Sequence, residues 1–201
     1  KEKIKNFFVN NKKKLISIII FFLLLLFSFI FYQEYEKGKT KRLAEKFNTS
    51  IIQHESGDKS KILISMQNII EEKDKTYSPL AFFYLLDNDL LTSKEEINKF
   101  FDIIINEVKI DKENKNLTIF KKGLFNSEFA NENELLKILN PVIKSESIWK
   151  PHALYLMAEY YFSKAEKQKS KEFLEKLISL QNINVKLKME AQKRLRSDFS
   201  E

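Results

Sequence analysis

The chain has 201 residues, of which 43% are hydrophobic and 31% charged, so it can bury a sizeable core as one domain with an appendage. It has no cysteine and only two histidines, which excludes disulfides, cysteine nucleophiles and a three-histidine zinc site. Three glycines and three prolines are too few for an all-β fold or a glycine-rich phosphate loop. The composition therefore predicts an all-α protein with little catalytic equipment.

The first predicted element is a membrane-spanning helix over residues 15–32. These 18 residues contain no charge, proline or glycine, and at about 1.5 Å per residue they extend about 27 Å, close to a hydrocarbon core of about 30 Å. A buried helix of a soluble protein would usually carry a polar face. A cleaved signal peptide has a shorter apolar region and a small-x-small site, whereas this run ends Phe-Tyr-Gln-Glu-Tyr-Glu. We therefore predict an uncleaved anchor that contacts membrane lipid.

Charge predicts the orientation of this anchor. Six lysines against Glu2 give residues 1–32 a net charge of +5, which leaves +2 of the total +7 for residues 33–201. The basic segment 1–14 should remain in the cytoplasm and the remainder should be translocated. A net charge of +2 over the folded part disfavours a nucleic-acid partner. Because the chain opens at Lys1 rather than methionine, we also expect a segment upstream of it to be missing.

Helical periodicity continues through residues 33–201. Residues 34–46 are predicted as a charged continuation of the anchor helix, with Gly38 as its weak point. Beyond them, apolar residues recur at intervals of three and four. Helix starts are indicated by Ser56-Gly-Asp, by a capping box from Ser93 to Glu96, and by Pro151 in a first turn.

The segments after the anchor also resemble one another, with a period typical of helical hairpins. In a tetratricopeptide register, residues 151–184 place the small residues Ala158 and Ser170 where two antiparallel helices cross. Equivalents of Ser170 are Leu135, Ile97 and Ile62, at separations of 35, 38 and 35 residues, and Gly123 is the small first-helix residue of the third copy. We predict about four degenerate repeats capped by a helix over 185–195. An irregular helical bundle is the alternative.

The chain resembles a known family. The residues that carry the resemblance are the anchor followed by Gln33–Lys37, the segments Ser56–Ser60 and Trp149–Ala158, and the ending Ala191–Leu195. The sequence is similar to the tetratricopeptide-like domain of the ancillary subunit of the bacterial Sec translocon, shared with an envelope cell-division coordinator, in its α-proteobacterial type. In the turn of the last repeat, the family has Gly-Asp where this chain has Glu166-Lys167. This departure should weaken the turn.

The resemblance implies a single-pass protein of the bacterial inner membrane, with a cytoplasmic N-terminus and a periplasmic domain over 33–201. Such a protein would be a scaffold beside the translocon that passes exported chains to periplasmic chaperones. The family has no catalytic residues or cofactor to carry over, so a non-enzymatic role is expected. Two alternatives remain: a structural subunit of a stable membrane complex, and a cell-division or envelope coordinator.

Repeat geometry points to partner-binding residues on the first helices, outside the core between repeats. They form one column along a helix face, and aromatic residues with a charged neighbour are typical of contact surfaces. The predicted residues are His152, Tyr155, Glu159 and Phe162 in the last copy, and Phe120 and Leu124 in the third, with Ser127 beside them. The same residues could instead pack against the long helix that follows the anchor. His54 and His152 lack metal-ligand spacing, so no metal is expected.

Overall fold

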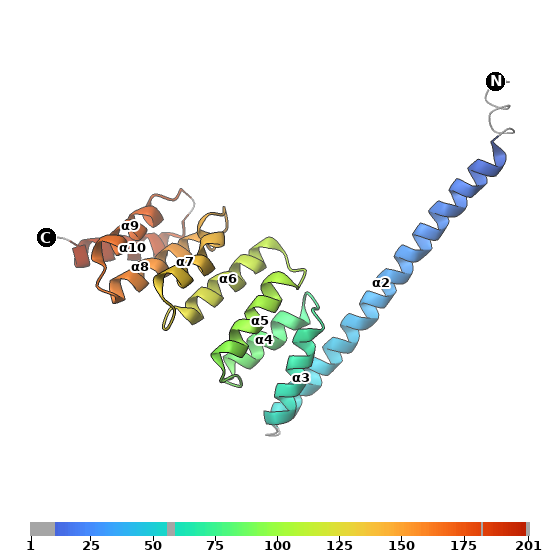
Figure 1. The fold of residues 1–201 in the computed structure, drawn as a ribbon, viewed down its shortest axis with the longest axis horizontal. Helices are drawn as coiled ribbons and strands as arrows, with labels where there is room; N and C mark the ends of the chain where they lie inside the picture. The colour runs from blue at the N-terminus through green and yellow to red at the C-terminus, as the bar shows by residue number, and fades with distance from the viewer. Residues whose placement is uncertain (1–10, 56–58, 182, 200–201) are drawn as a thin grey trace. The chain divides into compact units, whose positions relative to one another are not determined.

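The computed structural model describes residues 11–55, 59–181 and 183–199, and every regular element within them is an α-helix (Figure 1). This confirms the predicted all-α class. The helices are α2 (Lys12–Glu55), α3 (Lys59–Glu71), α4 (Tyr77–Asp87), α5 (Lys94–Asn106), α6 (Lys112–Asn126), α7 (Glu132–Ile143), α8 (Lys150–Ser163), α9 (Lys167–Ile178) and α10 (Val185–Phe199).

Helix α2 is one uninterrupted helix of 44 residues. Its apolar window has a mean hydropathy of 2.9 and none of it is buried, so side chains such as Phe22, 63% exposed, have no protein neighbour to cover them. The chain therefore has one N-terminal helix long and apolar enough to cross a membrane. The predicted charged continuation is confirmed, because the helix runs through Gly38 without a break.

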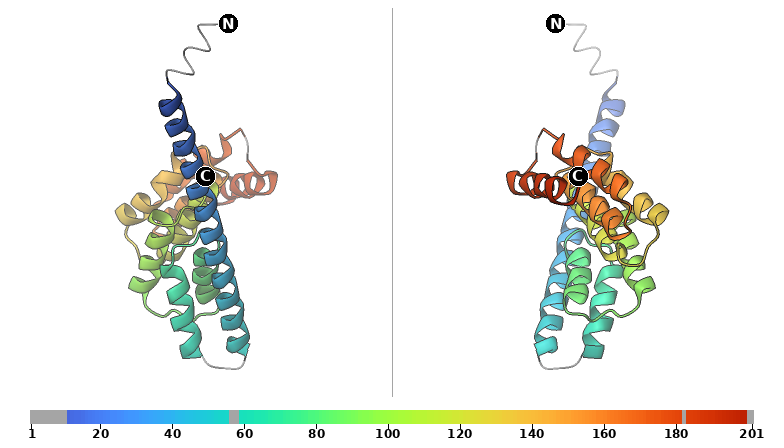
Figure 2. Two further views of the ribbon diagram at one scale, coloured as in Figure 1. Left: turned by 90° about the vertical axis from the view of Figure 1, so that its right-hand side faces the viewer. Right: turned by 90° about the vertical axis from the view of Figure 1, so that its left-hand side faces the viewer.

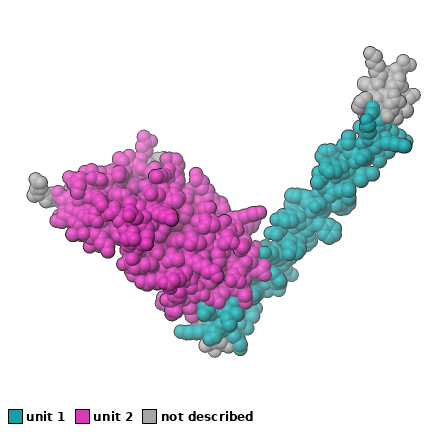
Figure 3. Space-filling view, viewed as in Figure 1, with its two compact units in different colours: residues 1–65 teal, residues 66–201 magenta. Residues whose placement is uncertain are grey.

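The chain divides into two compact units, residues 1–65 and residues 66–201, with the division inside α3 (Figure 3). In the first unit, the C-terminal end of α2 and the start of α3 are antiparallel neighbours, joined by a 2.6 Å hydrogen bond between the hydroxyls of Ser50 and Ser65. Ser50 also donates to the carbonyl of Lys46 and is 2% exposed. The predicted start signal Ser56-Gly-Asp and the lysines at 1, 3 and 5 lie outside the described residues.

In the second unit, each helix from α4 to α9 packs against the next one, α6 also touches α8, and α10 packs against α9 (Figures 1 and 2). The aromatic part of the core lies at α4 and α5, where Phe82 and Phe101 meet edge to face with ring centroids 4.7 Å apart. The α3–α4 turn is fixed by Asp74, whose carboxylate accepts from the amides of Thr76 and Tyr77, both at 2.8 Å.

The predicted helix starts are confirmed in part. Pro151 lies in the first turn of α8, as expected. Ser93 caps α5 by accepting from the amide of Glu96 at 3.2 Å, but the predicted capping box is only half formed. The carboxylate of Glu96 instead accepts from Gln67 at 2.7 Å. A complete box occurs at the start of α7, between Asn131 and Glu134.

Small residues set the distance between paired helices. Ala158 of α8 and Ser170 of α9 are 0% and 1% exposed, and the Ser170 hydroxyl donates to the carbonyl of Ala158 at 2.9 Å. Gly123 of α6 is the small residue that lets α7 come close. Its neighbour on α7 is Leu139, one turn beyond Leu135, which the repeat register predicted at the crossing. A Cβ atom on Gly123 would lie 2.8 Å from Cγ of Leu139. The α8–α9 turn places Ala165 at φ 59°, a conformation that favours glycine.

These contacts predict opposite effects of one substitution at two glycines. Gly123→Leu should lower the free energy of unfolding by about 2–3 kcal/mol, because Leu139 is fully buried and cannot move aside. Gly38→Leu should be neutral or stabilising by up to about 1 kcal/mol, because nothing lies within 4 Å of the new Cβ. Thermal unfolding followed by circular dichroism measures both. Equal melting temperatures for the two variants would contradict the α6–α7 crossing.

Candidate functional site

Three residues of the predicted column on α8 face α10: Tyr155, Glu159 and Phe162. The hydroxyl of Tyr155 donates to Glu190 at 3.4 Å. The carboxylate of Glu159 forms a bidentate ion pair with Arg194, at 2.8 and 2.9 Å from its Nη2 atom. The structure therefore brings predicted residues together, but it brings them against a helix of the same chain.

Arg194 is the centre of this contact. Its guanidinium carbon lies 4.6 Å from the ring centre of Phe162, and its Nη1 atom pairs with Asp198 at 2.7 Å. The ring of Phe162 also meets that of Phe199 edge to face, with centroids 6.0 Å apart. One arginine thus engages two carboxylates and an aromatic face, an arrangement that the planar guanidinium favours.

The environment of Tyr155 reflects this closure. Burial, together with the nearby carboxylates of Glu159 and Glu190, raises the pKa of its phenol to about 12. The phenol therefore remains a neutral hydrogen-bond donor at neutral pH. Among the described residues, no group of three or more histidine, aspartate or glutamate side chains is arranged to hold a metal ion.

His152 and Phe120 belong to a second cluster, which is formed by α6 and the start of α8. The rings of Phe120 and Trp149 are stacked with centroids 6.0 Å apart, and His152 lies 5.9 Å from the first and 5.4 Å from the second. The Nδ1 atom of His152 is buried and has no hydrogen-bond partner among the described residues. Leu124 is 52% exposed, whereas the other five predicted residues are partly buried.

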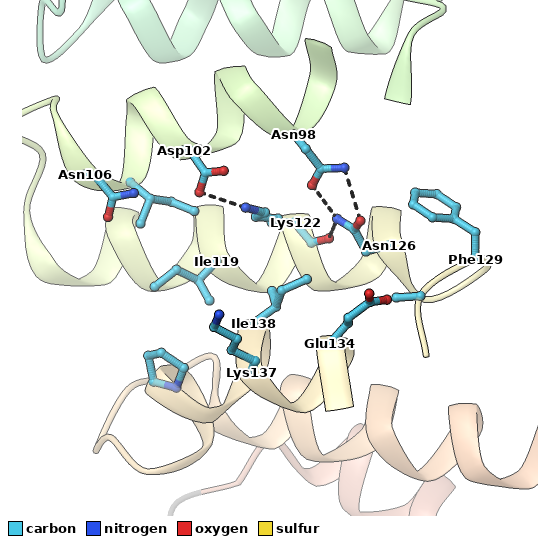
Figure 4. Close-up of a pocket in the computed structure, with 13 residues that line it drawn as sticks. Asn98, Asp102, Asn106, Ile119, Lys122, Asn126, Phe129, Glu134, Lys137 and Ile138 are labelled. Carbon is cyan, nitrogen blue, oxygen red and sulfur yellow. Dashed lines mark hydrogen bonds and ion pairs between the residues drawn. The ribbon is translucent and has the colours of Figure 1, made fainter. Parts of the chain in front are cut away.

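A groove of about 600 Å³ that was not predicted from the sequence lies between α5, α6 and α7 (Figure 4). Its apolar surface includes Ile119 and Ile138. Its polar side contains two asparagines that exchange hydrogen bonds, since the amide of Asn126 donates to Asn98 at 2.8 Å and that of Asn98 donates back at 3.2 Å. The ammonium of Lys122 pairs with Asp102 at 2.7 Å.

A proline forms one wall of this groove. Pro141 lies inside α7 and has no N–H, so the carbonyl of Lys137 lacks its helical donor. Pro141 and Lys137 both line the groove. An extended segment that brings apolar side chains would match the apolar surface of the groove. Asn98, Asp102 and Asn106 recur every four residues on α5, a polar column that could have indicated the groove from sequence.

Glu132 joins three helices beside these sites. Its carboxylate accepts from Tyr161 at 2.8 Å and from the ammonium of Lys169 at 2.9 Å, which connects α7, α8 and α9. The hydrogen bond from Lys169, followed by that from Tyr161, lowers the pKa of Glu132 below its ordinary value of 4.5.

No protein-family model, curated protein or solved structure matches the chain.

The lowered pKa of Glu132 predicts an acid-dependent stability. A carboxyl group whose pKa is lower in the folded state stabilises the fold above its unfolded pKa, and this contribution is lost as the pH falls through the folded value. Unfolding measured from pH 7 downward should show stability falling below about pH 4.5. Glu132→Gln should remove part of that slope. A slope unchanged in the variant would show that Glu132 does not contribute.

The α8–α10 contact predicts that Arg194 holds α10 in place. Arg194→Met should raise the hydrogen-exchange rate of the amides over 185–199 roughly tenfold, since a bidentate pair is worth about 1–2 kcal/mol. Lys193→Met is the matched control, because Lys193 is exposed and its neighbour Arg194 keeps the ion pair. Equal exchange in both variants would contradict this role.

Proposed function

We propose that the chain is a non-enzymatic, membrane-anchored scaffold that binds protein partners through an array of tetratricopeptide-like helical pairs. The observation that carries the proposal is the period of the contacts between alternate helices. Tyr155 and Glu190, like Glu159 and Arg194, are 35 residues apart and connect α8 with α10. A constant separation between contacting residues is what stacked repeats produce.

The earlier helices support the same register. Glu113 of α6 accepts from Ser147, 34 residues later, just before α8. Lys121 lies over the ring of Phe83, 38 residues earlier, and connects α6 with α4. In the sequence, equivalent positions of successive copies are separated by 35, 38 and 35 residues. The separation of 38 residues joins the second and third copies, as the contact between Phe83 and Lys121 does. The pairs would be α4–α5, α6–α7 and α8–α9, with α10 in the position of a further first helix.

The proposed location follows from α2. Its exposed apolar stretch would lie in the bacterial inner membrane, Lys12–Lys14 would remain cytoplasmic, and the helical pairs would be periplasmic. With the resemblance noted above, this arrangement suits a protein ancillary to the Sec translocon that contacts exported chains or periplasmic chaperones. The groove between α5 and α7 presents apolar side chains beside polar ones, and an unfolded segment could contact both.

The partner-binding residues fall into two sets under this proposal. Phe120 and His152 pack around Trp149 on the α6 side, where Leu124 and Ile148 are 52% and 68% exposed. Tyr155, Glu159 and Phe162 already contact α10, so a partner reaches them only if α10 moves. We therefore assign the primary contact to the α6 side.

Crosslinking tests the proposal. A photo-crosslinking residue at Leu124 in the full chain, in native membranes, should capture translocon subunits, periplasmic chaperones or exported chains. Asn133, exposed on α7, is the control position and should capture fewer of these proteins. Capture of none of the named classes by a folded chain would contradict the proposal.

Native electrophoresis then separates the adaptor from its alternatives. An adaptor complex should dissociate as salt rises, whereas a structural subunit should remain in a complex of fixed stoichiometry. Recovery of division proteins rather than translocon subunits would favour the envelope-coordinator alternative.

A further inference from the structure

Helix α10 has three of its basic residues on the side away from α8. It holds five basic and two acidic residues. Both acidic residues lie toward α8, where Glu190 accepts from Tyr155 and Asp198 pairs with Arg194. Ala191, at the centre of the inner face, is 0% exposed.

The opposite side, here called the outer face, consists of Val185, Lys186, Met189, Lys193 and Arg196. At 100° per residue these five side chains fall within about one third of the helix circumference, and all five are exposed. Val185 and Met189 are 72% and 63% exposed. The five side chains of the outer face are thus two apolar groups and three cations.

We propose that the outer face of α10 docks on an anionic lipid bilayer, with Val185 and Met189 among the headgroups and the three cations beside lipid phosphates. Exposed apolar side chains flanked by lysine and arginine are what a helix lying in the membrane interface requires. The charge is complementary to anionic lipid, and each cation near such a surface strengthens the attraction.

The membrane anchor makes the bilayer the favoured partner over an acidic protein. A tethered chain meets the surface at a high effective concentration, so a weak contact is sufficient. This inference rests on the anchoring part of the proposed function, but not on the protein partners. It also assigns α10 a second role, because its inner face closes α8 while its outer face contacts lipid.

The test uses the full chain in nanodiscs made of phosphatidylcholine alone or enriched in phosphatidylglycerol. The chain has no cysteine, so Gln192→Cys provides a single labelling site at the edge of the outer face. A fluorophore there should be quenched by headgroup-labelled lipid in the anionic discs, and much less in phosphatidylcholine or at high salt.

Two charge-matched triple variants decide the outcome. Lys186→Gln, Lys193→Gln and Arg196→Gln together should lower the docked-to-undocked ratio roughly a hundredfold. Lys109→Gln, Lys112→Gln and Lys115→Gln remove the same charge at exposed sites before and within α6 and should leave quenching unchanged. The inference would be overturned by equal quenching in both lipid compositions, or by an equal loss of quenching in both triple variants. It would also be overturned if quenching followed the number of protein chains per disc instead of the lipid composition. A chain that does not remain in the disc contradicts the anchor instead, so the two failures are distinguishable.

Discussion

The close approach of paired helices at small residues is the constraint on which the second unit depends. Between α8 and α9, Ala158 and Ser170 leave so little side chain that a hydroxyl reaches a backbone carbonyl directly. Leu154, Leu174 and Leu177 then fill the surrounding space and are almost completely buried. Between α6 and α7, Gly123 admits Leu139 at the same kind of crossing. Since packed interiors tolerate neither voids nor overlap, these small residues fix the positions of the larger ones.

Contacts between α7 and α8, and between α8 and α10, combine apolar and polar groups, since Leu139 of α7 and Met157 of α8 lie in one buried cluster. Polar side-chain contacts connect Glu132 with Lys169, Glu159 with Arg194, and Glu113 with Ser147. Such contacts are weaker than apolar burial but more directional, because they require a donor and an acceptor at a fixed separation. Apolar contacts thus join helices both within and between these pairs, and the polar contacts add directional links between them.

The sequence predicted the helical class, the long N-terminal helix and the meeting of Ala158 with Ser170, because each depends on local pattern or on residue size. It did not predict that Glu96 bonds to Gln67 instead of completing its capping box, since that choice depends on a residue 29 positions away. The groove between α5 and α7 was missed for the same reason: its walls come from three helices. Glu159 and Arg194 did carry a signal, because these opposite charges stand 35 residues apart, the separation predicted between copies.

The contact between α8 and α10 changes what the predicted column means. Aromatic residues beside a charge were expected to mark a surface for another molecule, and in the structure the chain's own α10 meets the same chemistry. Arg194 and Phe199 satisfy Glu159 and Phe162 as a partner would. A terminal helix in that position covers apolar surface of α8 and α9. The contact also has an apolar part, because Ala191 of α10 is fully buried in one cluster with Leu154 and Ala158 of α8. Helix α10 of the same chain therefore covers the side chains at which the sequence predicted a partner.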